Sequence, residues 1–133
     1  MKKKYHGSCH CGAVQFEASI DLKGETSKCN CSVCTKSRFW KTVVPAADFR
    51  LLQGEESLTD YQFGPKTIHH LFCKHCGVKT FGRGTLPAGD VIYAINVVSL
   101  DDASTKEWAE APVVFQDGRN DAQGSPPAET RYL

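Results

Sequence analysis

Seven cysteines in three tight groups are the residues of this sequence best suited to carry chemistry. The groups are a C-x-C, a C-x-C-x-x-C and a C-x-x-C motif, made by Cys9 and Cys11, by Cys29, Cys31 and Cys34, and by Cys73 and Cys76. Cysteines so close in sequence are poor disulfide partners for each other, but their thiolates readily chelate one metal ion. The spacing therefore predicts metal binding rather than disulfides or scattered core thiols.

Four of these thiols are expected to form a closed structural zinc site. Structural zinc takes four protein ligands, commonly four thiolates, and seven thiols divide into four and three. The three cysteines of the middle motif lie on one turn and can bind one ion together. That leaves a set which we call the quartet: Cys9, Cys11, Cys73 and Cys76. Such a site would clip together two distant segments and remove chain entropy from the unfolded state.

The remaining set, which we call the trio, comprises Cys29, Cys31 and Cys34. Three protein ligands leave one position of a zinc ion open, as in catalytic zinc sites. An alternative is that His69 or His70 supplies a fourth ligand, which would make both ions structural. These two histidines are adjacent on a presumed strand, so their side chains face opposite ways and one of them could reach inward. An open fourth position is the primary prediction.

The three thiolates indicate which chemistry an open site would suit. With Zn²⁺ they carry a net charge of −1, so the ion would polarise water less than one held by three neutral imidazoles. A soft ligand set favours a fourth soft ligand, such as the thiolate of a small molecule. Zinc would lower the pKa of that thiol and hold its sulfur near an electrophile. The trio thus predicts handling of a small thiol rather than hydrolysis.

Short strands are expected to position these cysteines. Residues 13–20, AVQFEASI, alternate apolar and polar side chains, which is typical of a half-buried strand. Further strands are predicted at TSKCNC, FWKTVVP, FRLLQG, SLTDYQFG, KTIHHLFC, VKTFGRG and DVIYAINVV. One helical turn is expected at residues 32–37, with Ser32 as a possible N-cap, and a short helix within DDASTKEWAE. Many short strands with little helix predict an all-β fold.

Composition limits the organisation and the partners of the chain. At 133 residues, with 41% hydrophobic and 23% charged residues, residues 1–133 are expected to form a single domain, with an irregular tail from about residue 116. The formal net charge of +1 gives no reason to expect nucleic acid or an anionic membrane as partner. No apolar run follows the basic start MKKKY, and the longest apolar stretch is too short to span a bilayer. A cytoplasmic protein is expected.

The order of the cysteine motifs adds a family resemblance. GSCHCGAVQFE, CNCSVCTKS and FCKHCGVKTF together resemble the signature of the glutathione-dependent formaldehyde-activating enzyme family, also called the CENP-V/GFA domain family. The resemblance covers about residues 5–115. It implies an Mss4-like all-β fold, the β-tent. It also implies two zinc ions per chain, a structural one on the quartet and a catalytic one on the trio.

The resemblance further implies a carbon–sulfur lyase that interconverts S-(hydroxymethyl)glutathione with glutathione and formaldehyde. The partners would be a small thiol such as glutathione and an aldehyde. Glutathione carries two carboxylates, and a guanidinium can bind a carboxylate with two hydrogen bonds, so Arg38 and Arg83 are candidate contacts. No residue stands out as a proton donor. The alternative is a non-catalytic, zinc-stapled binding module of the same fold, which a closed trio site would favour.

Overall fold

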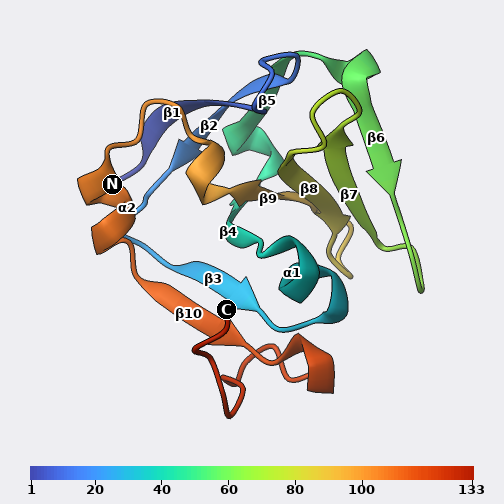
Figure 1. Ribbon diagram of the computed structural model, residues 1–133, viewed down its shortest axis with the longest axis vertical. Helices are drawn as coiled ribbons and strands as arrows, with labels where there is room; N and C mark the ends of the chain where they lie inside the picture. The colour runs from blue at the N-terminus through green and yellow to red at the C-terminus, as the bar shows by residue number, and fades with distance from the viewer.

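Ten short strands in two sheets make up most of the regular structure in the computed structural model, which describes residues 1–133 (Figure 1). The smaller sheet has the order β1 (Lys3–Ser8), β2 (Gln15–Ile20) and β5 (Phe49–Gln53). The larger sheet has the order β10 (Val113–Gln116), β3 (Thr26–Cys29), β4 (Trp40–Pro45), β9 (Val91–Asn96), β8 (Lys79–Thr85), β7 (Ile68–Cys73) and β6 (Leu58–Tyr61). Only β10 and β3 pair in parallel. The predicted all-β fold is confirmed, and it is consistent with the Mss4-like class.

Helices are few and short. The α-helices are α1 (Ser32–Ser37) and α2 (Thr105–Glu110), and the 3-10 helices are η1 (Ala46–Asp48), η2 (Glu55–Ser57), η3 (Val97–Ser99) and η4 (Gly118–Asn120). Ser104 caps α2 in a capping box with Glu107. No helix in the structure is long and apolar enough to cross a membrane.

Two local expectations need correction. The N-cap of α1 is Cys31, not Ser32, because Cys31 is the last extended residue and its sulfur accepts the backbone N–H of Cys34. Strand β10 was not predicted, because its pairing with β3 is a contact between segments far apart in the sequence. A local pattern in the residues after Pro112 does not contain that information.

The core lies where the two sheets pack against each other. Phe16 and Phe49 of the small sheet contact Phe81 and Tyr93 of the large sheet, with Phe49 and Tyr93 stacked at 4.0 Å between ring centroids. Phe16 and Phe81 are almost fully buried. Burial of large aromatic rings of this kind dominates the stability of a small core. The packed sheets thereby hold the strand ends that carry the cysteines.

The quartet cysteines come from two turns that the core brings together. Cys9 and Cys11 lie in the turn between β1 and β2, and Cys73 and Cys76 at the turn between β7 and β8. Gly12 and Gly77 follow with φ of 82° and 78°, left-handed conformations that favour glycine and tighten each turn. The trio lies at the end of β3 and in α1, where the chain leaves the sheet for one helical turn.

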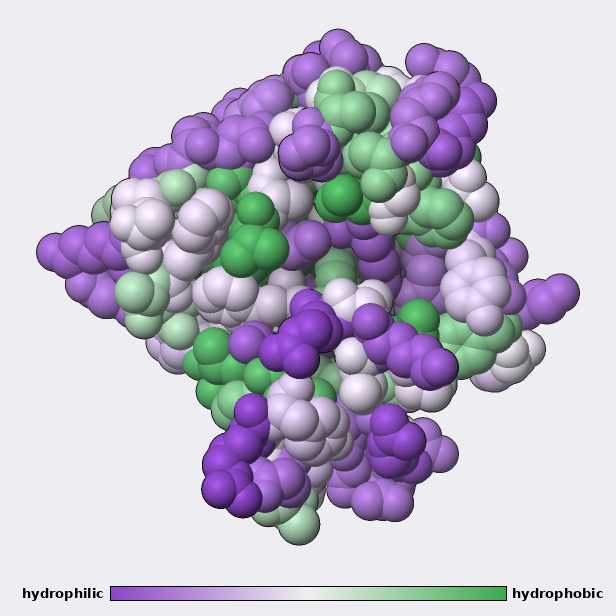
Figure 2. All heavy atoms as spheres, viewed as in Figure 1, coloured by the Kyte–Doolittle hydropathy of each residue, from purple (hydrophilic) through white to green (hydrophobic).

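Residues beyond β10 form a lobe at the bottom of Figure 1, next to β3 and β10. Figure 2 shows that this lobe is largely hydrophilic on the visible face. A hydrogen bond from the backbone N–H of Asp117 to the carbonyl of Ser125 and an isolated bridge between Asp117 and Ala122 fold the lobe back on itself.

Candidate metal centres and the adjoining pocket

The quartet sulfurs lie close enough to share one metal ion. All four are within 4.8 Å of one another, with Cys9 to Cys11 at 3.7 Å and Cys11 to Cys73 at 3.6 Å. Four sulfurs around a tetrahedral zinc ion, each about 2.3 Å from it, are separated by roughly 3.8 Å. The donor set and its spacing therefore fit zinc.

Backbone N–H groups point at the quartet sulfurs. Val14 donates to Sγ of Cys9 at 3.3 Å, and His75 donates to Sγ of Cys73 at 3.4 Å. Each donor occupies one side of its sulfur and helps to fix the position of that sulfur. The turns thus hold these sulfurs in place within the cluster.

The trio sulfurs also lie within 4.8 Å of one another. The backbone N–H of Cys31 donates to Sγ of Cys29, and that of Cys34 to Sγ of Cys31, each at 3.4 Å. A hydrogen bond from the thiol of Cys34 lowers the pKa of Cys31 to about 5 and raises the pKa of Cys34 itself. The side chains of Cys31 and Cys34 are therefore in direct contact, as expected of ligands for one cation.

No histidine or carboxylate joins the trio cluster. Nδ1 of His69 lies 2.6 Å from a carboxylate oxygen of Asp60, and Nδ1 of His70 lies 2.8 Å from Nζ of Lys79. The two histidines thus face different partners, as expected for neighbours on one strand. The trio is left with three ligands from its own short segment.

A segment far along the chain covers one side of the trio. Gln123 Oε1 lies 3.9 Å from Sγ of Cys29, and Gly118 packs directly against the same sulfur. Asn30, between two trio cysteines, holds this segment in place by bonding the side chain of Asp117 and the backbone N–H of Arg119, both at 2.9 Å. Sequence analysis did not anticipate this cover, and the turn-forming DGRN stretch was its one local signal.

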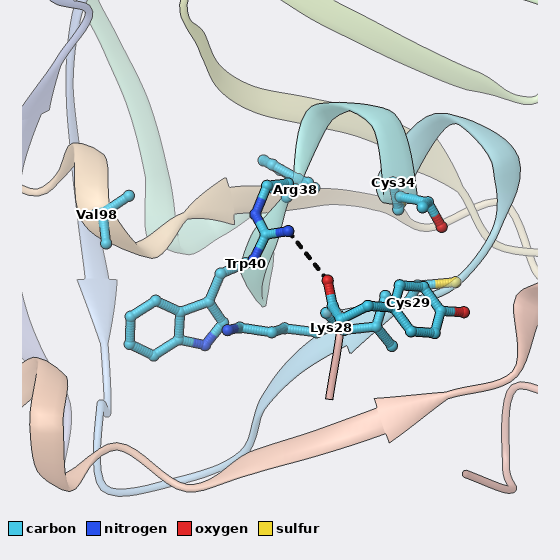
Figure 3. A pocket seen from close by; sticks show the side chains of 10 residues that line it. Lys28, Cys29, Cys34, Arg38, Trp40 and Val98 are labelled. Atoms are coloured by element: carbon cyan, nitrogen blue, oxygen red, sulfur yellow. Dashed lines mark hydrogen bonds between the residues drawn. The ribbon is translucent and has the colours of Figure 1, made fainter. Parts of the chain in front are cut away.

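The other side of the trio borders a pocket of about 150 Å³ (Figure 3). Arg38 and Cys34 reach it from the helical segment, and Lys28 and Cys29 from strand β3. Phe39 and Trp40 add apolar walls, together with Val98. Tyr132 and Leu133 also line the pocket, and the guanidinium of Arg38 donates a hydrogen bond of 3.0 Å to the carbonyl of Tyr132. The last described residues of the chain therefore occupy part of the space beside the trio.

Residues 4–117 match the family described as glutathione-dependent formaldehyde-activating enzyme. The chain belongs to this family. It is also similar to the crystal structure of a Rhodobacter sphaeroides protein from a structural genomics programme, with 32% sequence identity and a TM-score of 0.69. That similarity covers 82% of this chain and 99% of the other. The family resemblance carried by the three cysteine motifs is thereby confirmed.

The two arginines predicted to contact substrate in this formaldehyde-activating family member lie in different places. Arg38 lines the pocket beside the trio. Arg83 lines a separate cavity with Phe49, Glu55 and Tyr93, on the side of the small sheet. The structure therefore brings Arg38, but not Arg83, to the trio.

Two lysines act on the trio of this family member, and sequence analysis missed one of them, Lys79, as a candidate site residue. Burial lowers the pKa of Lys79 to about 8, while the negative charges of Cys34 and Cys31 oppose that shift. Lys41 also acts on the trio, since its charge lowers the pKa of Cys34 against the stronger effects of the Cys31 hydrogen bond and burial. The residues around a lysine in a strand do not indicate how far that lysine lies from a cysteine in another element.

Proposed function

We propose that this protein is a zinc-dependent carbon–sulfur lyase that makes and breaks S-(hydroxymethyl)glutathione or a closely related adduct of a small thiol and an aldehyde. Family membership supports chemistry on glutathione and formaldehyde in general. In this proposal the quartet holds a structural zinc ion and the trio a catalytic one, so each chain binds two.

One observation carries the proposal: three cysteine sulfurs cluster without a fourth histidine or carboxylate, and two of these cysteines, Cys29 and Cys34, line a pocket. A closed structural site would need a fourth protein ligand. A bound zinc ion would supply Lewis acidity that lowers the pKa of a substrate thiol. The ligand set fits this metal because three thiolates are soft donors at chelating distances.

The pocket residues supply binding and orientation. The guanidinium of Arg38 can exchange the carbonyl of Tyr132 for a carboxylate of the thiol, which is the stronger, charge-assisted partner. Trp40 and Phe39 exclude water from one side of the reacting sulfur. Thr35 lines the same pocket, and its hydroxyl is a candidate for donating a proton to the aldehyde oxygen.

Entry of a tripeptide thiol requires a rearrangement in this pocket. Sites for small molecules usually enclose roughly 300–1,000 Å³, whereas this pocket encloses about 150 Å³. Tyr132 and Leu133 line the pocket from the lobe beyond β10, outside every strand and helix. We therefore expect the substrate to displace them.

The test combines metal content with exchange kinetics. Reduced, freshly purified protein should contain two zinc ions per chain, and Cys31→Ala should contain one. NMR exchange spectroscopy then measures how fast ¹³C-formaldehyde and its glutathione adduct interconvert above the uncatalysed rate. The parent should accelerate the exchange and Cys31→Ala should not. Equal rates for the two proteins would remove the support for a lyase and favour the binding module.

A further inference from the structure

The ammonium group of Lys79, on β8, lies in a cage formed by one side chain from β7 and one from the segment between α1 and β4. Its Nζ lies 2.8 Å from Nδ1 of His70 on β7 and 3.9 Å from the ring centroid of Phe39. Because an ammonium has only donors, Nδ1 of His70 must accept this hydrogen bond, and the ring is neutral. Burial, the largest cause, and the charge of Lys79 lower the pKa of His70 to about 4, which agrees with a neutral ring.

Gly82, in the middle of β8, lies beside the side chain of Lys79. A β-carbon there would make ordinary contact with Nζ of Lys79 at 3.8 Å, and a tight contact with the carbonyl oxygen of His69 at 3.2 Å. Glycine in a strand interior often marks a close approach by another group. Here the approaching group is the backbone carbonyl of His69 on the neighbouring strand β7.

Lys79 is half-buried, and its ammonium has no carboxylate partner. Its neighbours in the cage are a neutral imidazole and an aromatic ring. The anionic groups that favour its charged form are the sulfurs of Cys34 and Cys31. Phe39, on which the ammonium rests, is bonded through its backbone N–H to the carbonyl of Cys34 and lines the trio pocket. Lys79 therefore lies against the segment that carries Cys34, and its charge interacts with the charges of Cys34 and Cys31.

A second lysine lies at the same level of the sheet. Lys41 on β4 pairs with Asn96 on β9, and the side chain of Asn96 donates to the carbonyl of Lys79 at 2.9 Å. Nζ of Lys41 bonds Gln116 Oε1 at 2.9 Å and likewise has no carboxylate partner. Strands β4 and β8 of one sheet thus each carry a lysine whose charge acts on the trio.

We propose that Lys79 is a positioning residue of the trio, whose caged positive charge offsets the negative charge of the thiolates and so secures the metal ion and an incoming thiolate there. Three thiolates and Zn²⁺ leave a charge of −1, and a fourth thiolate would make it −2. A nearby cation in a region of low dielectric offsets that accumulation. The inference that Lys79 supports the metal ion depends only on the clustered trio cysteines. The inference about an incoming thiolate rests on the proposed function.

The experiment measures how firmly the trio holds zinc. A colorimetric chelator is titrated into the two-zinc protein, and the zinc missing from Cys31→Ala identifies the trio fraction. In Lys79→Met, half of the trio zinc should be removed at a chelator concentration about 10- to 100-fold lower than in the parent, the range seen when groups supporting metal ligands are lost. The quartet fraction should be unchanged.

Matched variants separate charge from shape. Lys79→Arg keeps the positive charge and should retain trio zinc far better than Lys79→Met. Lys23→Met removes an exposed lysine that belongs to neither cysteine cluster and does not line the trio pocket, and it should match the parent. Parent-like trio affinity in Lys79→Met, or an equal loss in Lys79→Arg, overturns the proposal. If circular dichroism shows that Lys79→Met does not fold, Lys79→Gln, which can still donate to His70, undergoes the same comparison and decides it.

A glutathione titration of the same proteins distinguishes the two proposals. The parent should bind glutathione more tightly than Lys79→Met at saturating zinc. If the parent shows no glutathione binding, the proposed function fails, while the chelator comparison still decides whether Lys79 supports the metal ion.

Discussion

Gly118 lies so close to Cys29 that a β-carbon at position 118 would come within 2.5 Å of the cysteine sulfur. The same β-carbon would also meet the side chain of Gln123 at 2.8 Å and Cβ of Cys31 at 3.1 Å. Real β-carbons do not approach heavy atoms this closely, so any other residue here must displace the trio or the cover. A residue outside the cysteine motifs thus helps to determine the geometry of the trio.

Gly118→Ala should therefore weaken metal binding at the trio. The methyl group must push Cys29 or the 117–123 segment away, and a displacement of a metal ligand costs about 10-fold or more in affinity. Zinc content and chelator titration measure the effect. Gly124→Ala, in the same lobe, is the matched control because nothing lies within 4 Å of its β-carbon position. An unchanged trio in Gly118→Ala would show that the cover yields instead.

Arg38 and Tyr132 should have opposite effects on glutathione binding. Arg38→Ala removes the proposed carboxylate partner and should raise the Kd about tenfold, whereas Tyr132→Ala opens the pocket and should lower it. Calorimetric titration of glutathione measures both. Arg131→Ala is the control, because its guanidinium bonds Glu129 at 2.7 and 2.9 Å, and Arg131 does not line the pocket. A higher Kd for glutathione in Tyr132→Ala would mean that Tyr132 contributes to the binding site rather than obstructing it.

The quartet and the trio should contribute very differently to stability. Cys11 is exposed, so Cys11→Ser disturbs little packing, yet it removes one of four expected zinc ligands. We expect it to lower the free energy of unfolding by on the order of 3–5 kcal/mol. Cys31→Ser should cost about 1 kcal/mol or less, because the trio lies within one short segment and joins no distant strands. Denaturant unfolding of zinc-loaded proteins compares the two, and equal losses would contradict the division of roles.

Two buried threonines provide a test of the core. Thr80 is fully buried and its hydroxyl has no hydrogen-bond partner. Thr80→Val keeps the shape and removes the unsatisfied group, so it should raise the free energy of unfolding by about 1 kcal/mol. Thermal or denaturant unfolding measures the change.

Thr26→Val is the matched comparison, and it should change the free energy of unfolding in the opposite direction to Thr80→Val. The hydroxyl of Thr26 bonds the carbonyl of Pro112 and accepts from Nε1 of Trp40 at 2.8 Å, and the residue is equally buried. Its loss leaves both partners unsatisfied and should cost about 1–3 kcal/mol. A gain in Thr26→Val, or a loss in Thr80→Val, would show that side-chain packing outweighs hydrogen bonding at these positions.

The sequence by itself determined the features that depend on local spacing. Cysteines two or three positions apart can reach one ion without help from the fold, so the trio was readable from CNCSVC. The strand at residues 13–20 was readable from its alternation, since Phe16, Ala18 and Ile20 must share a face. The two outer cysteine pairs were grouped because a closed zinc site needs four ligands, and four thiols remain once the middle motif is set aside. The order of the three motifs indicated the family.

Only the tertiary structure decided what surrounds the trio. Gly118, Tyr132 and Lys79 come from segments far from Cys29 in the sequence. Gly118 contacts Cys29, Tyr132 lines the adjoining pocket, and Lys79 contacts Phe39 of that pocket, because the fold brings these segments together. The same order places Arg83 beside the small sheet, away from the pocket. Hydrophobic periodicity reports which face of a strand is buried, but it carries no information on which other strand lies opposite. The substrate pocket and the charges around it depend on that pairing of distant segments.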